Sequence, residues 1–307
     1  MKKIMLGGAL LAAALLLSGC GGRAPQVQPT QEPAATATAA PVATAQPTTE
    51  PAGPAGFVQP CVDQPYDYYY ADDAKQIAIH RYSQNEITFL AADVQLTDAS
   101  QFRIALSKDA PFSALEPAST MAQRNGAVLA INADDYGVHD YGTIIRDGAL
   151  LRAHDTTRNM LIVDQNGDFS VRVDRNGEDP EALAQQLIDA GVRHSFEFGP
   201  ELIRDGAAVE FSPDFDVIST SPTRREPRTA IGQIGPLHYI VVVADGRQPG
   251  YSKGMTLPEL QQVFLHFGAQ TAMNLDGGGS AEMWFQGEII SRPAEGAERK
   301  LSDIIWF

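Results

Sequence analysis

The sequence predicts a mixed α+β fold with a mostly β core and a few flanking helices. Runs rich in β-branched and aromatic residues recur between turn residues through the first half of the chain. Two later segments carry helix-start signals followed by an apolar stripe. Several continuous apolar runs end in polar clusters, which is typical of strands that are buried on both faces.

The N-terminal segment is predicted to lie outside this fold. Lys2 and Lys3 precede an apolar run over residues 4–17, which has the form of a secretory signal peptide. The run is too short for a membrane-spanning helix, which needs about 20 apolar residues. It ends in Leu-Ser-Gly-Cys at residues 17–20 and resembles the lipobox of bacterial lipoproteins. That resemblance implies a signal peptide over 1–19 and a lipid on Cys20, which would anchor the protein at the extracytoplasmic face of a bacterial cell membrane.

Residues 20–56 follow as a lipidated cysteine and a predicted disordered tether. The segment is dominated by Pro, Ala, Thr, Gln and Gly, and it has too few large apolar residues to offset the entropy of ordering. The folded part is therefore predicted to cover residues 57–307, enough for one sizeable core or two small domains sharing a sheet.

The charge and the cysteines exclude some classes of function. The formal net charge of −15 argues against nucleic acid as a partner, because the long-range field would repel it. An anionic substrate could still bind at a local cluster of arginines or amide groups. Once Cys20 is lipidated, Cys61 is alone, so neither a disulfide framework nor a zinc site is expected.

The elements follow in order along the chain. Strands are expected over 77–82, 86–96, 102–107 and 127–132, then two hairpins that turn at Asp147-Gly148 and Asn166-Gly167. One helix is predicted from Asp179-Pro180 to Gly191, and a second from the capping box at Thr256 to Gly268. Further strands are expected over 194–198, 239–246 and 271–275, and a closing strand over 300–307.

Three of the buried runs end in polar side chains. One ends in Asn132 and Asp134, one in Asp245, and one in Asn274 and Asp276. Ligands commonly bind at the carboxyl ends of neighbouring strands. If the three strands are neighbours, their polar ends form one site.

The last of these clusters continues into a turn that is almost without side chains. Its residues are Gly277, Gly278, Gly279 and Ser280. Adjacent glycines cost backbone entropy, so we expect them where a ligand must approach the backbone closely. Ser280 lacks the glycine two residues later that a nucleophile elbow needs. The Lys-Ser/Thr ending of a nucleotide-binding loop is also missing.

Carboxylates, arginines and glycine amides suit a sugar-phosphate diester. Glycosyl transfer needs a carboxylate near the anomeric carbon. A phosphate leaving group departs as a stable anion, and it gains more from cations and hydrogen bonds than from an acid. Arginine offers phosphate a paired fork, worth about 1.5–3 kcal/mol per charged hydrogen bond. Successive glycine N–H groups can add an anion-binding nest.

Four segments of the chain resemble the phosphodiester glycosidase family in order and spacing. They are Pro-Arg-Thr-Ala-Ile-Gly (227–232), Asp-Gly-Arg-Gln-Pro-Gly-Tyr-Ser (245–252), Gly-Met-Thr-Leu-Pro-Glu-Leu (254–260) and Asn-Leu-Asp-Gly-Gly-Gly-Ser (274–280). The segment over 198–202 resembles a further one, and the match is strongest over 127–307. The loop over 132–137 departs from the family: it has Ala133, Asp134 and Asp135 where the family tends to show glycine and aromatic residues.

This resemblance implies a hydrolase that cleaves a sugar-1-phosphodiester in an envelope glycan or glycoconjugate and releases the sugar. Asp276 is the first candidate for the catalytic carboxylate, with Asp245 and Glu201 next. Arg228 and Arg247 are the arginines inside the matching segments, and at least one of them is expected at the phosphate. The remaining candidates for substrate contacts are Asn132, Asp134, Asn274, Gly277, Gly278, Gly279 and Ser280.

Two other functions remain open from the sequence. A binding lipoprotein could hold an envelope glycan without cutting it, and a glycan-assembly factor could transfer a sugar phosphate. The sequence identifies no cofactor with certainty, but Asp134, Asp135 and Asp276 could together hold Ca²⁺ through oxygen ligands, or they could cap loops or bind sugar hydroxyls. His139 and His154 lie in loops after the first polar cluster and show no metal-ligand spacing.

Overall fold

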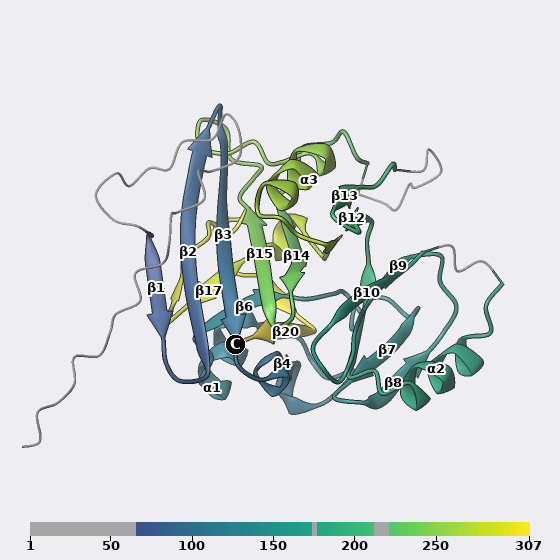
Figure 1. Cartoon of the computed structure of the whole chain (residues 1–307). Coiled ribbons are helices and arrows are strands. Elements are labelled where there is room, and N and C mark those ends of the chain that lie inside the picture. Colours follow the sequence, from purple (N-terminus) through teal and green to yellow (C-terminus); the bar gives the residue numbers. More distant parts are fainter. Residues whose placement is uncertain (1–65, 174–176, 212–220) are drawn as a thin grey trace, which may run out of the picture. The chain divides into compact units, whose positions relative to one another are not determined.

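The computed structural model describes residues 66–173, 177–211 and 221–307. The predicted signal peptide, Cys20, the tether and Cys61 lie outside these residues. The described residues form a mixed but strongly β-dominated fold (Figure 1), as the sequence predicts. Within this part of the chain, no helix is long and apolar enough to cross a membrane.

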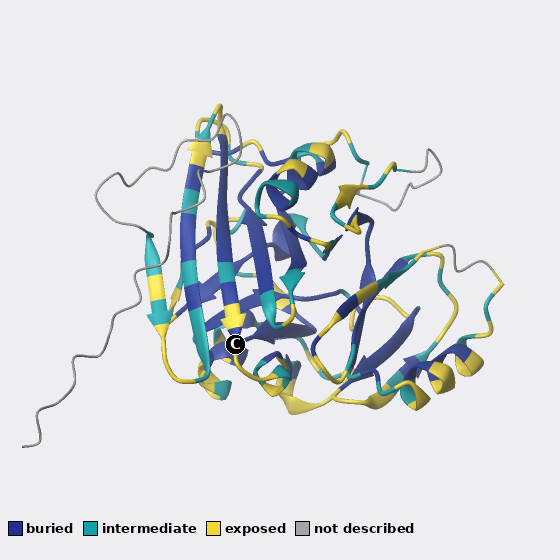
Figure 2. Ribbon diagram, in the orientation of Figure 1, coloured by how far each residue is buried: buried dark blue, intermediate teal, exposed yellow. Residues whose placement is uncertain are grey.

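An eight-stranded sheet forms the largest element, and every neighbouring pair in it is antiparallel. Its strands, in spatial order, are β1 (Tyr68–Ala71), β2 (Lys75–Gln84), β3 (Ile87–Leu96), β15 (His238–Ala244), β14 (Arg228–Gly235), β16 (Thr271–Asn274), β12 (Glu201–Arg204) and β13 (Ala207–Ala208). The central strands are buried along most of their length, whereas the edge strand β1 is half exposed (Figure 2). This burial on both faces explains why β15 reads as a continuous apolar run.

A five-stranded antiparallel sheet packs on one face of the large sheet. Its order is β18 (Glu288–Ile289), β17 (Met283–Phe285), β6 (Leu129–Asn132), β20 (Asp303–Trp306) and β4 (Arg103–Leu106). Side chains of both sheets form one apolar cluster, which includes Ile79, Val243, Ile131 and Ile305. The predicted closing strand is therefore confirmed, and it lies inside this sheet between β6 and β4.

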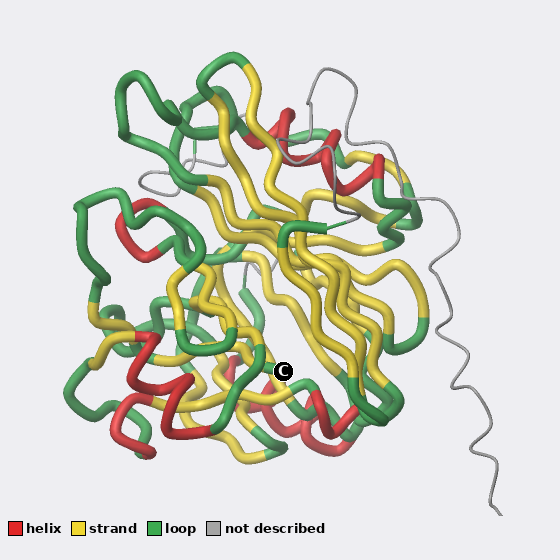
Figure 3. Tube along the Cα trace, turned by 90° about the vertical axis from the view of Figure 1, so that its left-hand side faces the viewer, coloured by secondary structure: helices red, strands yellow, loops and turns green. Residues whose placement is uncertain are grey.

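Helices cover the outer faces of the two sheets, as the view turned by 90° shows (Figure 3). Helix α3 (Leu257–His266) packs Leu260 and Phe264 on the far face of the large sheet. It begins at the predicted capping box, in which the Thr256 side chain accepts from the N–H of Glu259. Helix α1 (Ala118–Asn125) packs Met121 on the outer face of the five-stranded sheet.

Helix α1 is absent from the sequence-based prediction. Pro117 precedes it without any side-chain cap, and the segment is short, so the usual N-terminal signal is missing. The helix ends at Gly126, which has a left-handed φ of 66°. That glycine is the one local signal that could have revealed it.

The two predicted hairpins and the first predicted helix form a separate layer. The hairpin of β7 (Thr143–Arg146) and β8 (Ala149–Ala153) turns at Asp147-Gly148. It lies beside a three-stranded sheet in the order β10 (Phe169–Arg172), β9 (Asn159–Val163) and β11 (His194–Phe198). Helix α2 (Pro180–Asp189) covers this layer through Leu183 and Leu187. Asp179 caps the helix by accepting from two backbone N–H groups, as predicted.

Three short helical turns and one more strand pair complete the fold. The 3₁₀ turns cover Ala99–Gln101, Ser107–Asp109 and Gly278–Ser280. Strands β5 (Glu116–Pro117) and β19 (Lys300–Leu301) pair with each other. The last 3₁₀ turn holds the triple glycine that the sequence singles out.

Candidate active site

Strand ends from both sheets meet at Asp276. Strands β15 and β16 are each antiparallel to β14 between them, so their carboxyl ends lie at the same edge of the large sheet. The condition that the three strands are neighbours is not met, because β14 lies between β15 and β16 and β6 belongs to the other sheet. The last residue of β6 still reaches the site: Asn132 Nδ2 donates to the carbonyl of Asp276 at 2.6 Å, and its Oδ1 accepts from Thr229 Oγ1 at 2.6 Å. Asn132 therefore fixes the backbone at Asp276.

The glycines after Asp276 allow two arginines to approach the backbone. A Cβ atom on Gly278, which has a φ of 59°, would lie 3.1 Å from Nη2 of Arg247. A Cβ atom on Gly279 would lie only 2.1 Å from Nη2 of Arg299. In the structure, two guanidinium groups of the protein itself approach this turn, and the close approach of a ligand stays a prediction.

The sequence predicts that successive N–H groups of the glycine turn form an anion-binding nest, and this prediction is wrong for part of the turn. The N–H of Gly278 donates to the carbonyl of Pro227 at 2.9 Å, and the N–H of Ser280 donates to that of Gly277 at 3.0 Å. These two groups are already satisfied within the fold. The positive charge beside the turn therefore comes mainly from the arginine side chains.

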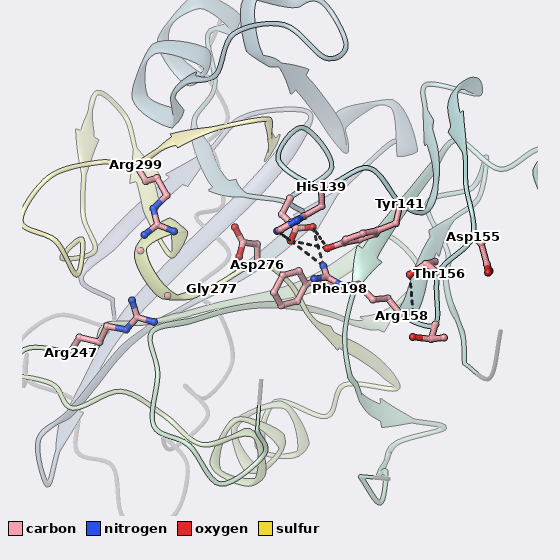
Figure 4. A pocket seen from close by; sticks show the side chains of 14 residues that line it. His139, Tyr141, Asp155, Thr156, Arg158, Phe198, Arg247, Asp276, Gly277 and Arg299 are labelled. Carbon is pink, nitrogen blue, oxygen red and sulfur yellow. Dashed lines mark hydrogen bonds and ion pairs between the residues drawn. The ribbon is translucent and has the colours of Figure 1, made fainter. Parts of the chain in front are cut away.

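A pocket of about 740 Å³ opens over this turn. Figure 4 shows Asp276 in its middle, with Arg247 and Arg299 on one side and an aromatic group on the other. A second pocket of about 320 Å³ adjoins the first, because both are lined by Asp135, His139, Asp276 and Arg299. The residues lining the larger pocket are Asp135, His139, Tyr141, Asp155, Thr156, Thr157, Arg158, Phe198, Arg247, Asp276, Gly277, Gly278, Gly279 and Arg299.

The surroundings of Asp276 raise the pKa of its carboxyl group. Burial raises the pKa of Asp276 to about 6, and the negative charge of Asp135 contributes in the same direction. Hydrogen bonds from the side chain of Ser280 and the N–H of Gly277, together with the charge of Arg299, oppose this rise. A carboxyl group poised near neutral pH inside a pocket is typical of catalytic sites.

The two predicted arginines have different positions. Arg247 lines the pocket, and its Nε donates to Glu226 at 2.6 Å while its terminal nitrogens face the glycine turn. Arg228 is only 2% exposed and does not line the pocket; it donates to the carbonyls of Met255 at 3.2 Å and Arg224 at 2.9 Å. Burial lowers the pKa of Arg228 to about 10. Arg228 thus holds loop backbones together, and Arg247 is the better candidate for the phosphate.

A stack of planar side chains forms the opposite wall of the pocket. The ring of His139 stacks on Tyr141 with centroids 5.4 Å apart. The guanidinium of Arg158 lies 4.3 Å from the ring centroid of Tyr141 and 4.8 Å from that of Phe198. Arg158 Nη1 also donates to both carboxylate oxygens of Asp135, at 3.0 and 3.1 Å. The wall offers flat apolar surface together with polar edges, which suits a sugar ring.

Two of the predicted catalytic carboxylates lie outside both pockets. The carboxylate of Asp245 accepts from the N–H of Arg292 at 2.8 Å and from the hydroxyl of Tyr251 at 2.7 Å, so it joins two loops. Glu201 forms an ion pair with Arg204 on the large sheet. A catalytic role for either carboxylate stays a prediction that this geometry does not favour.

Asn274 and Asp134, which are predicted to contact the substrate, bond to other groups of the protein. Nδ2 of Asn274 donates to the carbonyl of Gly199 at 2.9 Å. Asp134 and Asp303 share the buried guanidinium of Arg146, at 2.9 and 2.8 Å. Although Asp134 borders the smaller pocket, its carboxylate is bound by this arginine.

The predicted calcium ligands do not converge. Asp134 is paired with Arg146 and Asp135 with Arg158, so both carboxylates already have cationic partners. Among the described residues, no group of three His, Cys, Asp or Glu side chains is arranged to hold a metal ion. The geometry therefore favours the alternative, that these acids bind within loops or to a substrate.

Sequence reasoning missed part of this site. Tyr141, Arg158, Phe198 and Arg299 all line the larger pocket. The loop after β6 contains several aromatic and polar residues, and this composition could have indicated a ligand-binding loop. Arg299 comes from a polar segment near the C-terminus, and no local pattern marks it.

The fold and the pocket define a β-rich protein in which the buried carboxyl group of Asp276 lies between arginines and an aromatic wall, an arrangement suited to anionic sugar derivatives. A family model described as phosphodiester glycosidase matches residues 125–307, and the chain belongs to this family. The resemblance predicted from the sequence is confirmed. The family name indicates a hydrolase-type enzyme that acts on phosphodiester-linked sugars.

The chain is similar in sequence to one curated protein and in fold to solved structures. The chain is 31% identical over 200 residues to the SPbeta prophage-derived uncharacterized protein YomE of Bacillus subtilis (strain 168), which is 62% of this chain but only 29% of that protein. The structure is similar to the catalytic domain of zebrafish N-acetylglucosamine-1-phosphodiester alpha-N-acetylglucosaminidase, described as auto-inhibited by its pro-peptide, with a TM-score of 0.60, 18% identity, and coverage of 76% of this chain and 82% of that one. A hypothetical protein from Synechocystis matches with a TM-score of 0.58, 15% identity, and coverage of 76% and 62%.

Proposed function

We propose that this protein hydrolyses a sugar-1-phosphodiester by cutting the bond between the anomeric carbon and the phosphate oxygen. One observation carries the proposal: the carboxyl group of Asp276 lies in a pocket between two arginines and an aromatic wall (Figure 4). A sugar-1-phosphodiester has a sugar ring on one side of the bond at C1 and a charged phosphate on the other. The aromatic wall suits the sugar ring, and the arginines suit the phosphate. The products are a free sugar and a phosphomonoester.

The two sides of the pocket suggest how the substrate lies. Arg247 and Arg299 are placed to bind the phosphate over the glycine turn, since paired guanidinium donors match phosphate oxygens. Tyr141 and Phe198 offer flat faces for the sugar ring. The anomeric carbon then comes next to Asp276.

In this arrangement Asp276 acts on the anomeric carbon, either as nucleophile or by activating a water molecule. The phosphate departs as an anion that the two arginines stabilise. A strong general acid is unnecessary for such a leaving group. Ser280 and Asn132 contribute by holding the side chain and the backbone of Asp276.

The first prediction tests Asp276 directly. Asp276→Asn keeps the shape and part of the hydrogen bonding but removes both the nucleophile and the base. We expect turnover to fall by about 10³-fold while substrate still binds. The assay uses benzyl diesters of α- and β-linked glucose, galactose and N-acetylglucosamine 1-phosphates, with and without a chelator, and identifies the products. N-acetylglucosamine is included because the name of the zebrafish relative specifies it.

Asp140→Asn is the matched control, because Asp140 is 82% exposed in the same acidic loop region and does not line the pocket. It should retain wild-type turnover. Near-normal turnover in a folded Asp276→Asn variant would move the chemistry to another residue. Binding without turnover in the wild type would instead support a glycan-binding lipoprotein, and products that appear only with an acceptor glycan would support an assembly factor.

The second prediction separates the two arginines of the family segments. Arg247→Lys should raise KM by about tenfold or more and leave the melting temperature nearly unchanged, because an ammonium cannot reproduce the paired fork. Arg228→Lys should mainly lower the melting temperature, because Arg228 is buried and bonds to backbone carbonyls. The measurements are steady-state kinetics and thermal unfolding of both variants. The opposite pattern would assign the phosphate to Arg228.

We also propose that the protein works from a lipid anchor at the extracytoplasmic face of a bacterial membrane. Support comes from the lipobox-like ending at residues 17–20 and the tether that follows it. A substrate in an envelope glycan or glycoconjugate would then lie within reach of the tethered pocket.

A further inference from the structure

Asp135 faces the same space as Asp276. The larger and the smaller pocket share four lining residues, which are Asp135, His139, Asp276 and Arg299. The negative charge of Asp135 also acts on Asp276 and raises its pKa, so the two carboxyl groups lie close enough to interact. The junction of the two pockets therefore holds two carboxyl groups and one arginine.

Asp135 is held firmly in place. Both of its carboxylate oxygens accept from Arg158 Nη1, at 3.0 and 3.1 Å, and from the hydroxyl of Tyr141, at 3.2 and 3.1 Å. Arg158 is in turn held between the rings of Tyr141 and Phe198. A carboxylate fixed in this way can keep a constant position beside a reacting group.

Asp276 and Asp135 differ in whether a neighbouring side chain can exchange protons near neutral pH. Besides Asp135, the groups that act on Asp276 are the side chain of Ser280, the N–H of Gly277 and the charge of Arg299, and none of these three exchanges protons readily near neutral pH. Asp135 has His139 as a neighbour, with Nε2 3.5 Å from its Oδ2 and a side chain that is half exposed. Histidine is the side chain best suited to pass protons at neutral pH. Asp135 therefore has a half-exposed neighbour that is able to exchange protons with solvent.

We propose that Asp135 is the second catalytic carboxyl group, which takes a proton from the hydrolytic water after Asp276 has acted as the nucleophile. The inference rests on the proposed function and adds a named residue to it.

The proposed reaction takes place in two steps. A carboxylate oxygen of Asp276 bonds to C1 as the bond from C1 to the phosphate oxygen breaks, and the electron pair leaves on the phosphomonoester. A water oxygen then bonds to C1, the ester bond to Asp276 breaks, and its electron pair returns to that carboxylate. One proton of the water moves to Asp135 and leaves to solvent through His139. The net reaction consumes one water molecule and yields the sugar and the phosphomonoester.

The test uses Asp135→Ala in the full-length protein and the benzyl diester that the wild type cleaves fastest. Without the base, the first step should proceed and the second should stall. We expect a burst of about one equivalent of benzyl phosphate, followed by turnover about 10²–10⁴-fold slower than wild type. Mass spectrometry should find the sugar on Asp276. Azide needs no deprotonation, so it should restore turnover and yield a glycosyl azide.

The controls make each outcome decisive. Asp140→Ala should behave as wild type, because the carboxylate of Asp140 is exposed and lies outside the pocket lining. Turnover of Asp135→Ala within about twofold of wild type, or loss of the burst together with turnover and no effect of azide, overturns the assignment. A wild type that cleaves none of the diesters rejects the proposed function itself.

The wild type supplies a check that needs no variant, in case Asp135→Ala does not fold. If Asp135 takes a proton from water in the second step, steady turnover should slow in D₂O by about twofold while the burst keeps its rate. The burst is measured by rapid quenching of the same benzyl diester. Equal slowing of both phases, or of neither, contradicts the proposal.

Discussion

Glu282 carries a buried carboxyl group two residues after the glycine turn. It is 2% exposed, and its Oε1 has no hydrogen-bond partner within the described part of the chain. Burial raises the pKa of Glu282 from 4.5 to about 8, the charge of Glu298 adds to this rise, and the N–H of Ala118 opposes it. At neutral pH the side chain is therefore mostly protonated, and its ionisation would place an uncompensated charge beneath the site.

The third prediction follows from the sign of this shift. Because the pKa is higher in the folded state, the protonated group favours folding below about pH 4.5, and this contribution is lost as the pH rises toward about 8. The side chain of Glu282→Gln cannot ionise. The melting temperature of this variant minus that of the wild type should therefore be larger at pH 9 than at pH 5. Glu288→Gln is the control, because Glu288 is exposed on β18. A difference between Glu282→Gln and wild type that is the same at both pH values would contradict the prediction.

The turn after β16 combines glycines with separable roles. A Cβ atom on Gly277 would lie 2.7 Å from the backbone carbonyl of Pro227, which cannot move without the chain. A Cβ atom on Gly279 would lie 2.1 Å from Nη2 of Arg299, the far end of a flexible side chain that is 45% exposed. Gly277 therefore allows the turn to pack against the backbone of Pro227, and Gly279 leaves room for the guanidinium of Arg299.

The fourth prediction separates these roles. Gly279→Ala should displace Arg299 and raise KM by about tenfold with little loss of stability. Gly277→Ala should lower the free energy of unfolding by about 1–3 kcal/mol, because backbone must shift. Gly235→Ala is the control, since a Cβ atom there meets nothing within 4 Å. Kinetics and thermal unfolding of the three variants decide the matter, and equal effects of Gly277→Ala and Gly279→Ala on KM would refute the division.

Local patterns explain which elements the sequence could predict. Both predicted helices have capping residues next to an apolar stripe, and the hairpins turn at Asp147-Gly148 and Asn166-Gly167, so each signal lies within a few residues. Asp276, Arg247 and the glycines were found in the same way, because one continuous motif or a family segment contains them. Arg299 and Arg158 come to the pocket through pairings across the whole chain, which no local pattern contains.

The described part of the chain is a stack of layers, and it combines a local group of cations with the acidic net charge of the sequence. The sheet of eight strands lies between α3 and the five-stranded sheet, and α1 covers the outside. The formal net charge of −15 opposes adsorption to an anionic membrane surface, whereas the pocket arginines favour an anionic ligand locally. Residence at a membrane would therefore depend on a lipid rather than on the charge of the protein.

The fifth prediction tests that dependence. In the proposed lipoprotein, acyl chains on Cys20 supply about 0.8 kcal/mol per buried methylene group, and several chains together give stable attachment. Cys20→Ala should therefore remove the lipid and shift the protein from the membrane fraction to a soluble or mislocalised form. Cys61→Ala is the matched control, because Cys61 is the other of the two cysteines and should leave the anchor intact. Membrane fractionation and mass spectrometry of the N-terminal peptide give the readout. An exported Cys20→Ala protein that stays in the membrane fraction as firmly as the Cys61→Ala protein would show that something other than this cysteine holds it there.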